Sequence, residues 1–266
     1  MTKMQKKNIS RIFKNIYIYL VFLFLYLPIF YVIIFSFNTS KLNITFENFT
    51  FQWYGTFFKN RTLMEALSNT LIIGIISTII STIIGTIGAI GLSKYRFRGR
   101  DVIDKLLYIP IVIPEVVLGI ALLSIYSVLS IPLGLISITL SHITFSIPFV
   151  VITVRARLAG FDKYLEEAAM DLGANRIVTF WRVTLPLIMP GVLSGAMLAF
   201  SLSIDDVVIS FFTAGPGSTT LPLKIFSMVK TGVTPEVNAL STVIMVITII
   251  IIALNTAFQV RKLKAQ

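Results

Sequence analysis

The sequence contains no cysteine, a single histidine and few charged side chains. Without cysteine, the chain can form no disulfide, perform no thiol catalysis and bind no metal through thiolates. The single histidine, His142, lies in an apolar run, where a lone imidazole is more often packed or hydrogen-bonded than a metal ligand. Charged residues make up 13% of the chain, against about 25% in soluble domains. No phosphate-binding loop, catalytic triad or metal-ligand cluster is present, so we expect no catalytic residue, bound cofactor or metal.

Long apolar runs account for most of the chain. Hydrophobic residues make up 56% of its 266 residues, and six runs approach the roughly 20 residues needed to cross a bilayer. The predicted spans are residues 16–37, 67–92, 106–129, 133–154, 187–209 and 239–260. The first is longer than the apolar core of a signal peptide and no cleavage site follows it, so we expect it to remain as a span. The sequence predicts an all-α polytopic membrane protein in which residues 1–266 form a single transmembrane domain.

The positive charges are unevenly distributed among the segments that join these spans. If the N-terminus is cytoplasmic, the inner segments hold 18 of the 23 lysines and arginines, and the outer loops hold five. Cytoplasmic loops are enriched in basic residues. The charge pattern therefore predicts that both termini are cytoplasmic, together with the hydrophilic segment 155–186. It also explains the net charge of +11 without a nucleic-acid partner.

The hydrophilic segment contains the sequence EEAAMDLGANRIVTFWRVTLP at residues 166–186, which predicts two short helices. Asp162 is a candidate N-cap of the first helix, and Gly173 is a candidate stop after it. Asn175 can cap the second helix, which we expect to end at Leu185-Pro186 because proline interrupts helices. A thin, charged helix outside the membrane suits docking into another protein, although a solvated loop helix has the same shape.

Three acidic residues lie within the predicted spans: Glu115, Asp205 and Asp206. An ionised carboxylate in hydrocarbon costs at least about 2.5–3.5 kcal/mol, and no lysine or arginine within a span can pair with these three. Glu115 follows Pro114, where we expect the third span to be distorted. The acids can pair with another subunit, sit at the wet mouth of the bundle, or line a path for a cationic solute.

Aromatic residues are concentrated in the outer loop of residues 38–66, where Trp53 is one of seven. Aromatic rings at this level usually form a belt at the membrane interface. They can also form a docking face for another protein, or a gate that contacts a cation through its rings. The sequence alone leaves all three uses of these rings open.

One motif points to a known family. Glu167-Ala168-Ala169, then Gly173-Ala174, then Leu185-Pro186 resembles the "EAA" loop of binding-protein-dependent ABC importer permeases. The resemblance implies the type I importer permease fold, with six transmembrane helices and both termini cytoplasmic. It also implies that the loop couples to an ATPase subunit, which is where ATP is bound and hydrolysed, so that this chain is not an enzyme. The implied coupling residues are Glu166, Glu167, Ala168, Ala169, Asp171, Gly173 and Ala174.

Two further segments, residues 109–123 and 199–242, are similar to the PotC-type permeases of spermidine/putrescine importers. This resemblance implies a polyamine permease subunit that forms half of the translocation pathway. The implied substrate path contains Trp53, Glu115, Asp205 and Asp206, whose acidic side chains suit a polycation. The implied partners are a second, PotB-like permease subunit, a PotA-like ATPase dimer and a PotD-like extracytoplasmic substrate-binding protein. The implied location is the bacterial cytoplasmic membrane.

Two other functions are compatible with parts of this pattern. An ABC permease for iron, phosphonate or thiamine would share the loop and the architecture. An ion-coupled secondary transporter could use Glu115 and the two aspartates as a relay, but it would need no ATPase and leaves the EAA spacing unexplained. A scaffolding protein leaves the intramembrane acids unexplained.

Overall fold

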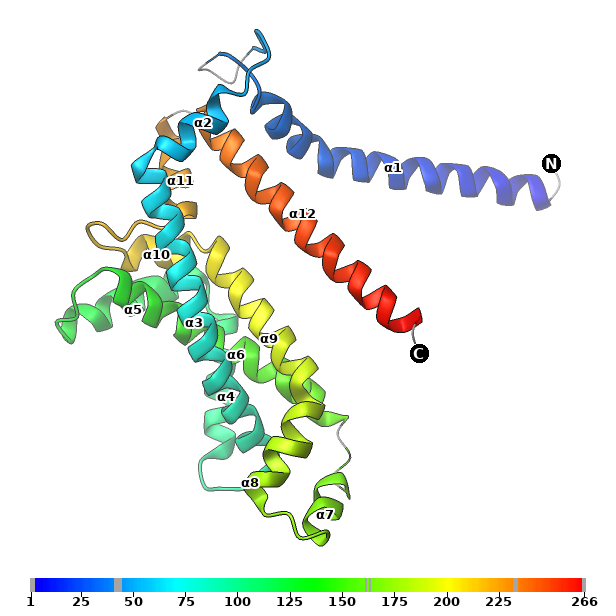
Figure 1. Ribbon diagram of the computed structural model, residues 1–266, viewed down its shortest axis with the longest axis vertical. Helices are drawn as coiled ribbons and strands as arrows, with labels where there is room; N and C mark the ends of the chain where they lie inside the picture. The colour runs from blue at the N-terminus through cyan, green and yellow to red at the C-terminus, as the bar shows by residue number, and fades with distance from the viewer. Residues whose placement is uncertain (1–2, 41–44, 161, 163, 232–233, 265–266) are drawn as a thin grey trace. The chain divides into compact units, whose positions relative to one another are not determined.

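The computed structural model describes residues 3–40, 45–160, 162, 164–231 and 234–264. Apart from one antiparallel bridge between Asn38 and Phe49, the regular structure of these residues is helical (Figure 1). The helices are α1 (Lys3–Phe35), α2 (Gln52–Lys59), α3 (Arg61–Lys94), α4 (Arg100–Val112), α5 (Glu115–Val128), α6 (Leu135–Ala159), α7 (Tyr164–Asp171), α8 (Arg176–Thr179), the π-helix η1 (Phe180–Thr184), α9 (Leu185–Asp205), α10 (Val208–Thr213), α11 (Leu221–Thr231) and α12 (Pro235–Lys264). The expectation of an all-helical chain is confirmed.

The helices form two compact units, Met1–Met64 with Ser227–Gln266, and Glu65–Phe226. We call them the terminal unit and the central unit. In the terminal unit, α12 packs against both α1 and α2. Trp53 and Phe57 lie one turn apart on α2 and are its buried side chains. The indole N–H of Trp53 donates a hydrogen bond of 2.6 Å to the Asn38 carbonyl, so this ring is a structural anchor of the outer loop.

Other rings of the outer loop cluster around Phe37 in the terminal unit. Phe37 stacks on Phe49 with 5.0 Å between ring centroids and meets Phe51 edge to face at 5.3 Å. Phe49 and Phe51 are largely exposed. Their exposure agrees with an interface belt and equally with a docking face, so both interpretations of the loop stay open.

In the central unit, α6 is the most buried helix and packs along α9 (Figure 1). Val150 and Val154 of α6 lie in one apolar core with Ile188 of α9. Gly191 and Gly195 of α9 allow the close approach: a Cβ on Gly191 would lie 2.6 Å from Cβ of Arg157. Small residues serve this purpose in membrane bundles, where apolar burial does not drive helix association.

The predicted third span is not one straight helix. Helices α4 and α5 meet at an angle of 113° around Ile113 and Pro114. Pro114 has no N–H to continue α4, and it holds the preceding Ile113 in an extended conformation with ψ of 135°. Glu115 is therefore the first residue of α5, at the bend, rather than midway along a continuous helix. The expected distortion at Pro114 is confirmed, and it is a complete break.

Four helical segments are long and apolar enough to cross a membrane: Lys14–Phe35, Arg61–Lys94, Leu135–Ala159 and Arg176–Asp205. The bent pair α4–α5 makes a fifth if it counts as one span. The described apolar part of α12, Pro235–Ile250, is shorter. The chain is therefore a helical membrane protein with four or five candidate spans among the described residues.

Candidate functional site

The hydrophilic segment between α6 and α9 folds as a helix, a glycine turn and a second helix. The Asp162 carboxylate accepts a 3.0 Å hydrogen bond from the Tyr164 N–H at the start of α7. Gly173 has φ of +88°, and the Ala174 N–H bonds back to the Ala169 carbonyl at 3.1 Å, which is the Schellman ending of a helix. Asn175 caps α8 by accepting from the Val178 N–H. The predicted caps and stop are confirmed.

The prediction that Leu185-Pro186 ends the second helix is wrong. Helix α8 passes through the π-helical turn η1 directly into α9, so residues 176–205 form one continuous helical segment. In η1 the Leu185 N–H bonds to the Phe180 carbonyl, five residues back. This wider turn shifts the hydrogen-bond register just before Pro186, which lies in the first turn of α9, where a missing N–H is tolerated. Residues 162–184, which we call the coupling segment after the role predicted for them, are thereby continuous with a membrane helix.

Glu166 on α7 faces into the central unit. Its carboxylate accepts hydrogen bonds from Lys94 at the end of α3 and from the Thr184 hydroxyl at the end of η1. Burial raises the pKa of the Glu166 carboxyl. The hydrogen bonds from Lys94 and Thr184 and the positive charge of Lys94 lower it by more than burial raises it, so the pKa lies below its ordinary value. Glu166 thus connects α7 to two other helices as a carboxylate.

The neighbouring side of the segment is exposed. Glu167, Ala168, Asp171 and Gly173 are exposed, whereas Ala169 and Ala174 are half-buried. Large apolar side chains are exposed beside them, including Leu172 at 91%. An exposed face with apolar and acidic side chains fits a docking surface. The structure therefore separates the predicted coupling residues: Glu166 is tied inward, and Glu167 is available to a partner.

Three of the four predicted substrate-path residues border one cavity of about 390 Å³ in the central unit. Glu115 lies at the start of α5, and Asp205 and Asp206 lie at the end of α9. The remaining wall is largely apolar and includes Phe145 and Phe149. The fourth residue, Trp53, belongs to the terminal unit, where it is buried, and its place in a substrate path stays a prediction.

Asp205 and Asp206 have different surroundings. Helix α9 ends at Asp205, which is exposed, whereas Asp206 is non-helical and its side chain is only 5% exposed. The Asp206 carboxylate accepts hydrogen bonds from the N–H groups of Ile209 at 3.1 Å and Ser210 at 2.7 Å. It therefore caps α10.

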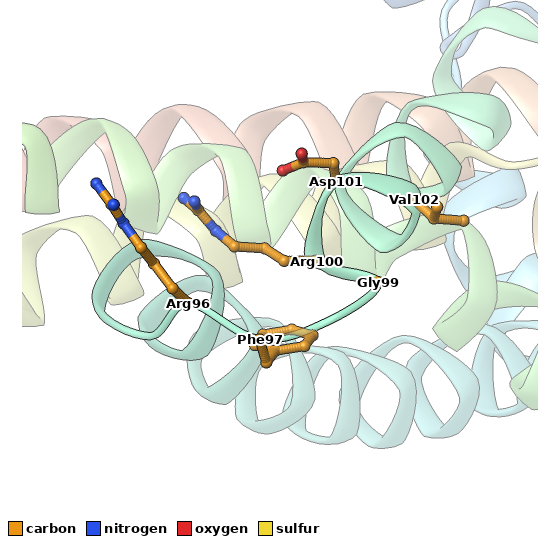
Figure 2. Close-up of a pocket in the computed structure, with 6 residues that line it drawn as sticks. All are labelled: Arg96, Phe97, Gly99, Arg100, Asp101 and Val102. Atoms are coloured by element: carbon orange, nitrogen blue, oxygen red, sulfur yellow. The ribbon is translucent and has the colours of Figure 1, made fainter.

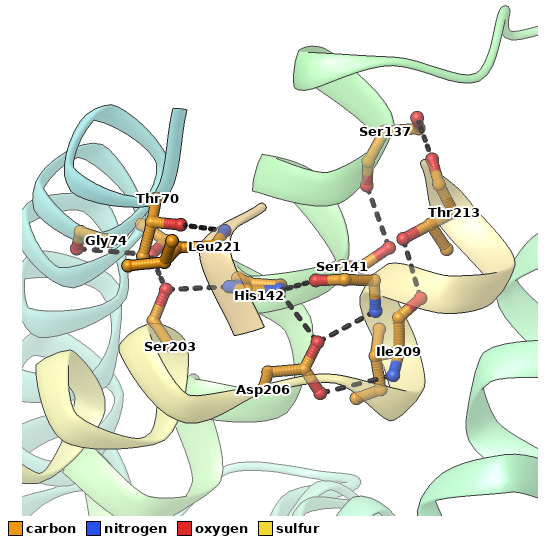
Figure 3. Close-up of polar contacts among 12 residues, drawn as sticks. Thr70, Gly74, Ser137, Ser141, His142, Ser203, Asp206, Ile209, Thr213 and Leu221 are labelled. Atoms are coloured by element: carbon orange, nitrogen blue, oxygen red, sulfur yellow. Dashed lines mark hydrogen bonds and ion pairs between the residues drawn. The ribbon is translucent and has the colours of Figure 1, made fainter. Parts of the chain in front are cut away.

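Asp206 also has a basic partner, contrary to the expectation that the intramembrane acids lack one. His142 Nε2 lies 3.3 Å from its Oδ2 atom (Figure 3). The imidazole is fully buried, and its Nδ1 atom lies 2.6 Å from Ser203 Oγ. The expectation missed this pair because only lysine and arginine were considered as partners. The interpretation of His142 as a packed, hydrogen-bonded residue is confirmed.

Another cavity of about 400 Å³ lies in the basic loop between α3 and α4 (Figure 2). Its lining includes Arg96 and Arg100 but none of the predicted site residues. Arg100 is committed to the fold, because its Nε atom donates to the Leu92 carbonyl at 2.8 Å. We therefore place the candidate site at the acidic cavity and the coupling segment.

Comparisons with known proteins identify relatives over most of the chain. Residues 81–262 match the family "Binding-protein-dependent transport system inner membrane component". The chain is 42% identical to the spermidine/putrescine transport system permease protein PotC of Escherichia coli over 92% of each chain. It is 40% identical to the putrescine transport system permease protein PotI of the same organism, over 84% of this chain and 82% of the relative.

The fold has a counterpart among solved structures. A chain of a bacterial ABC transporter involved in the import of the acidic polysaccharide alginate superposes with a TM-score of 0.72 at 17% identity. The match covers 97% of this chain and 98% of that one. At this identity the likeness concerns the fold alone. The family match and the two relatives establish that the chain belongs to the permease family of inner membrane components of binding-protein-dependent ABC transport systems.

Proposed function

We propose that the chain is one permease subunit of an ATP-driven importer for polyamines. The observation that carries the proposal is the acidic cavity, where Glu115 and Asp205 face a space with apolar and aromatic walls. A polyamine alternates ammonium groups with methylene chains, so carboxylates can bind its charges while Phe145 and Phe149 contact its methylenes and cations. Relatives named for spermidine and putrescine transport support the same solute class.

The cavity argues against an anionic solute. A site for an oxyanion would be expected to present arginine, lysine or helix N-termini. Lysine and arginine are absent from the described lining of this cavity. The two helix N-termini that border it, those of α5 and α10, already carry the carboxylates of Glu115 and Asp206. An ABC permease for a negatively charged solute is therefore the weaker proposal.

The proposed assembly contains four kinds of component. A second, PotB-like permease subunit supplies the other half of the pathway, and a PotD-like extracytoplasmic binding protein delivers the solute. A PotA-like ATPase dimer binds ATP and docks on the exposed face of the coupling segment around Glu167. This chain then needs no cofactor and catalyses no reaction. The proposed membrane is the bacterial cytoplasmic membrane, with six spans, a single transmembrane domain and both termini in the cytoplasm.

The test is uptake of labelled spermidine and putrescine in cells that lack this gene and its relatives. Expression of the whole transporter with the wild-type chain should restore uptake, and expression without this chain should not. Phosphonate and thiamine serve as control solutes. If neither polyamine accumulates while a control solute does, the polyamine assignment is wrong and the chain is a permease for that solute.

A further inference from the structure

The junction between α9 and α10 borders the acidic cavity and depends on one buried group. Asp206 and Val207 separate the two helices, and this break leaves backbone N–H groups that need partners. The Asp206 carboxylate is the partner of two such groups, because it accepts hydrogen bonds from the N–H groups of Ile209 and Ser210. The position of Asp205, one residue earlier, is therefore coupled to the position of Asp206.

His142 holds this junction from α6. Its Nε2 atom contacts both the Asp206 carboxylate at 3.3 Å and Ser210 Oγ at 3.2 Å. Its Nδ1 atom contacts Ser203 Oγ on α9 at 2.6 Å, and Ser203 in turn contacts Ser77 Oγ on α3 at 3.1 Å. One imidazole thus connects α6, α9 and α10, and Ser203 extends the network to α3, which lies at the left in Figure 3.

The network also divides the cavity's acids into two kinds. Asp206 is buried and paired, so little of its charge is available to a solute. Glu115 and Asp205 are exposed to the cavity, and no lysine, arginine or histidine among the described residues forms an ion pair with either of them. Removing the imidazole would leave Asp206 as an unpaired buried carboxylate, which is strongly unfavourable. That carboxylate would turn towards the cavity and displace Asp205 with it.

We propose that His142 is a positioning residue of the cation site. It withholds Asp206 from the solute and orients Asp205, which together with Glu115 presents the carboxylates that a cationic solute meets. The claim that the solute is a cation rests on the proposed function above, whereas the claim that His142 orients Asp205 does not. The experiment therefore has one arm that uses a polyamine and one that does not.

The transport arm compares His142→Leu with His142→Gln in the assembled transporter in proteoliposomes. Leucine removes both ring nitrogens, whereas the glutamine amide can still donate to Asp206 from a position close to Nε2. His142→Leu should raise the KM for spermidine about tenfold, because a buried polar group loses its partner. His142→Gln should stay within about threefold of wild type. ATP hydrolysis by the assembled transporter should be unchanged in both variants, and subunit assembly is measured for each.

The second arm exploits the absence of cysteine from this chain. Asp205→Cys introduces its only thiol, and the rate of modification by a cationic methanethiosulfonate reports how position 205 faces the cavity. The rate should fall about tenfold when His142→Leu is added, because thiol reactivity follows exposure, and should change little with His142→Gln. If His142→Leu alone does not assemble, the Asp206→Asn/His142→Leu pair removes the unpaired charge. The loss of the imidazole's contacts to Ser203 and Ser210 should then still lower the rate, by about threefold.

The two arms separate the outcomes. Equal labelling rates in the leucine and glutamine backgrounds would overturn the positioning role. An unchanged KM with intact polyamine uptake would also overturn it and leave the proposed function standing. The expected labelling pattern in a transporter that imports no polyamine would reject the proposed function and retain the positioning role.

Discussion

Adjacent carboxylates occur at two places in the central unit, and in each pair one is held by the protein while the other is exposed. At the coupling segment Glu166 is tied to Lys94 and Thr184, and Glu167 is exposed. At the acidic cavity Asp206 is paired with His142, and Asp205 is exposed. The held acid fixes local structure, which leaves its neighbour free to meet a partner or a solute.

The causes of the two arrangements differ. Glu166 and Glu167 lie on one helix, where successive side chains point about 100° apart. Asp205 and Asp206 diverge because the helix ends between them. The pairs also differ in exposure: the Lys94 and Glu166 side chains are 25% and 18% exposed, against 0% and 5% for His142 and Asp206. A partly exposed ion pair contributes up to about 1 kcal/mol, whereas leaving a buried carboxylate without its partner costs about 3–5 kcal/mol.

The largest effect is expected from reversing the exposed charge of the coupling segment. Glu167→Lys should reduce ATP-driven uptake at least about 100-fold, because a misplaced charge in an interface costs several kcal/mol. Capture of solute by the external binding protein should remain normal. The measurements are uptake in proteoliposomes and solute binding by the isolated binding protein. Uptake at the wild-type rate would show that Glu167 has no role in coupling to the ATPase.

Asp205→Asn should produce the next largest effect. Loss of one carboxylate that meets the cation should raise the KM for spermidine about 30-fold, since a hydrogen bond to a charged group contributes about 2 kcal/mol. Basal ATP hydrolysis should be unchanged. Asp206→Asn is the matched control: its amide oxygen can still cap α10, so the KM should change less. Equal effects of the two variants would abolish the distinction between the two acids.

A smaller effect is expected from breaking the ion pair between Lys94 of α3 and Glu166 of α7. Lys94→Glu or Glu166→Lys should lower the free energy of unfolding by about 1 kcal/mol and the Tm by about 2–4 °C. The double reversal, Lys94→Glu with Glu166→Lys, should recover most of the loss because it restores opposite charges. Thermal unfolding of the purified complex measures both. If the double variant is as unstable as the sum of the singles, the pair does not stabilise the segment.

The smallest effect is a pH dependence from Glu166. Its pKa lies below the ordinary value, so the folded state favours the carboxylate. The stability that it contributes is present above the ordinary glutamate pKa and is lost as the pH falls through the lowered pKa. Glu166→Gln should remove this component from a profile of Tm between about pH 3 and pH 6. Glu167→Gln, at an exposed neighbour, should leave that part of the profile unchanged.

Several features of the fold and the site could be predicted from the sequence because they depend on local chemistry. Apolar runs predict membrane helices, and the cap residues Asp162, Gly173 and Asn175 predict where the coupling helices begin and end. The continuation of the helix through Pro186 could not be predicted in this way. It depends on a π-turn whose hydrogen bonds shift by one residue, and no side-chain pattern specifies that register.

The sequence by itself determined the helical membrane class, the EAA spacing and the presence of carboxylates within apolar segments. Only the tertiary structure decided which of those carboxylates are available. The two members of each pair are distant in the sequence. Lys94 meets Glu166 only when α3 packs near α7, and His142 meets Asp206 only when α6 packs against the end of α9. The free energy of a buried charge depends on what surrounds it, and those surroundings exist only after the helices have packed.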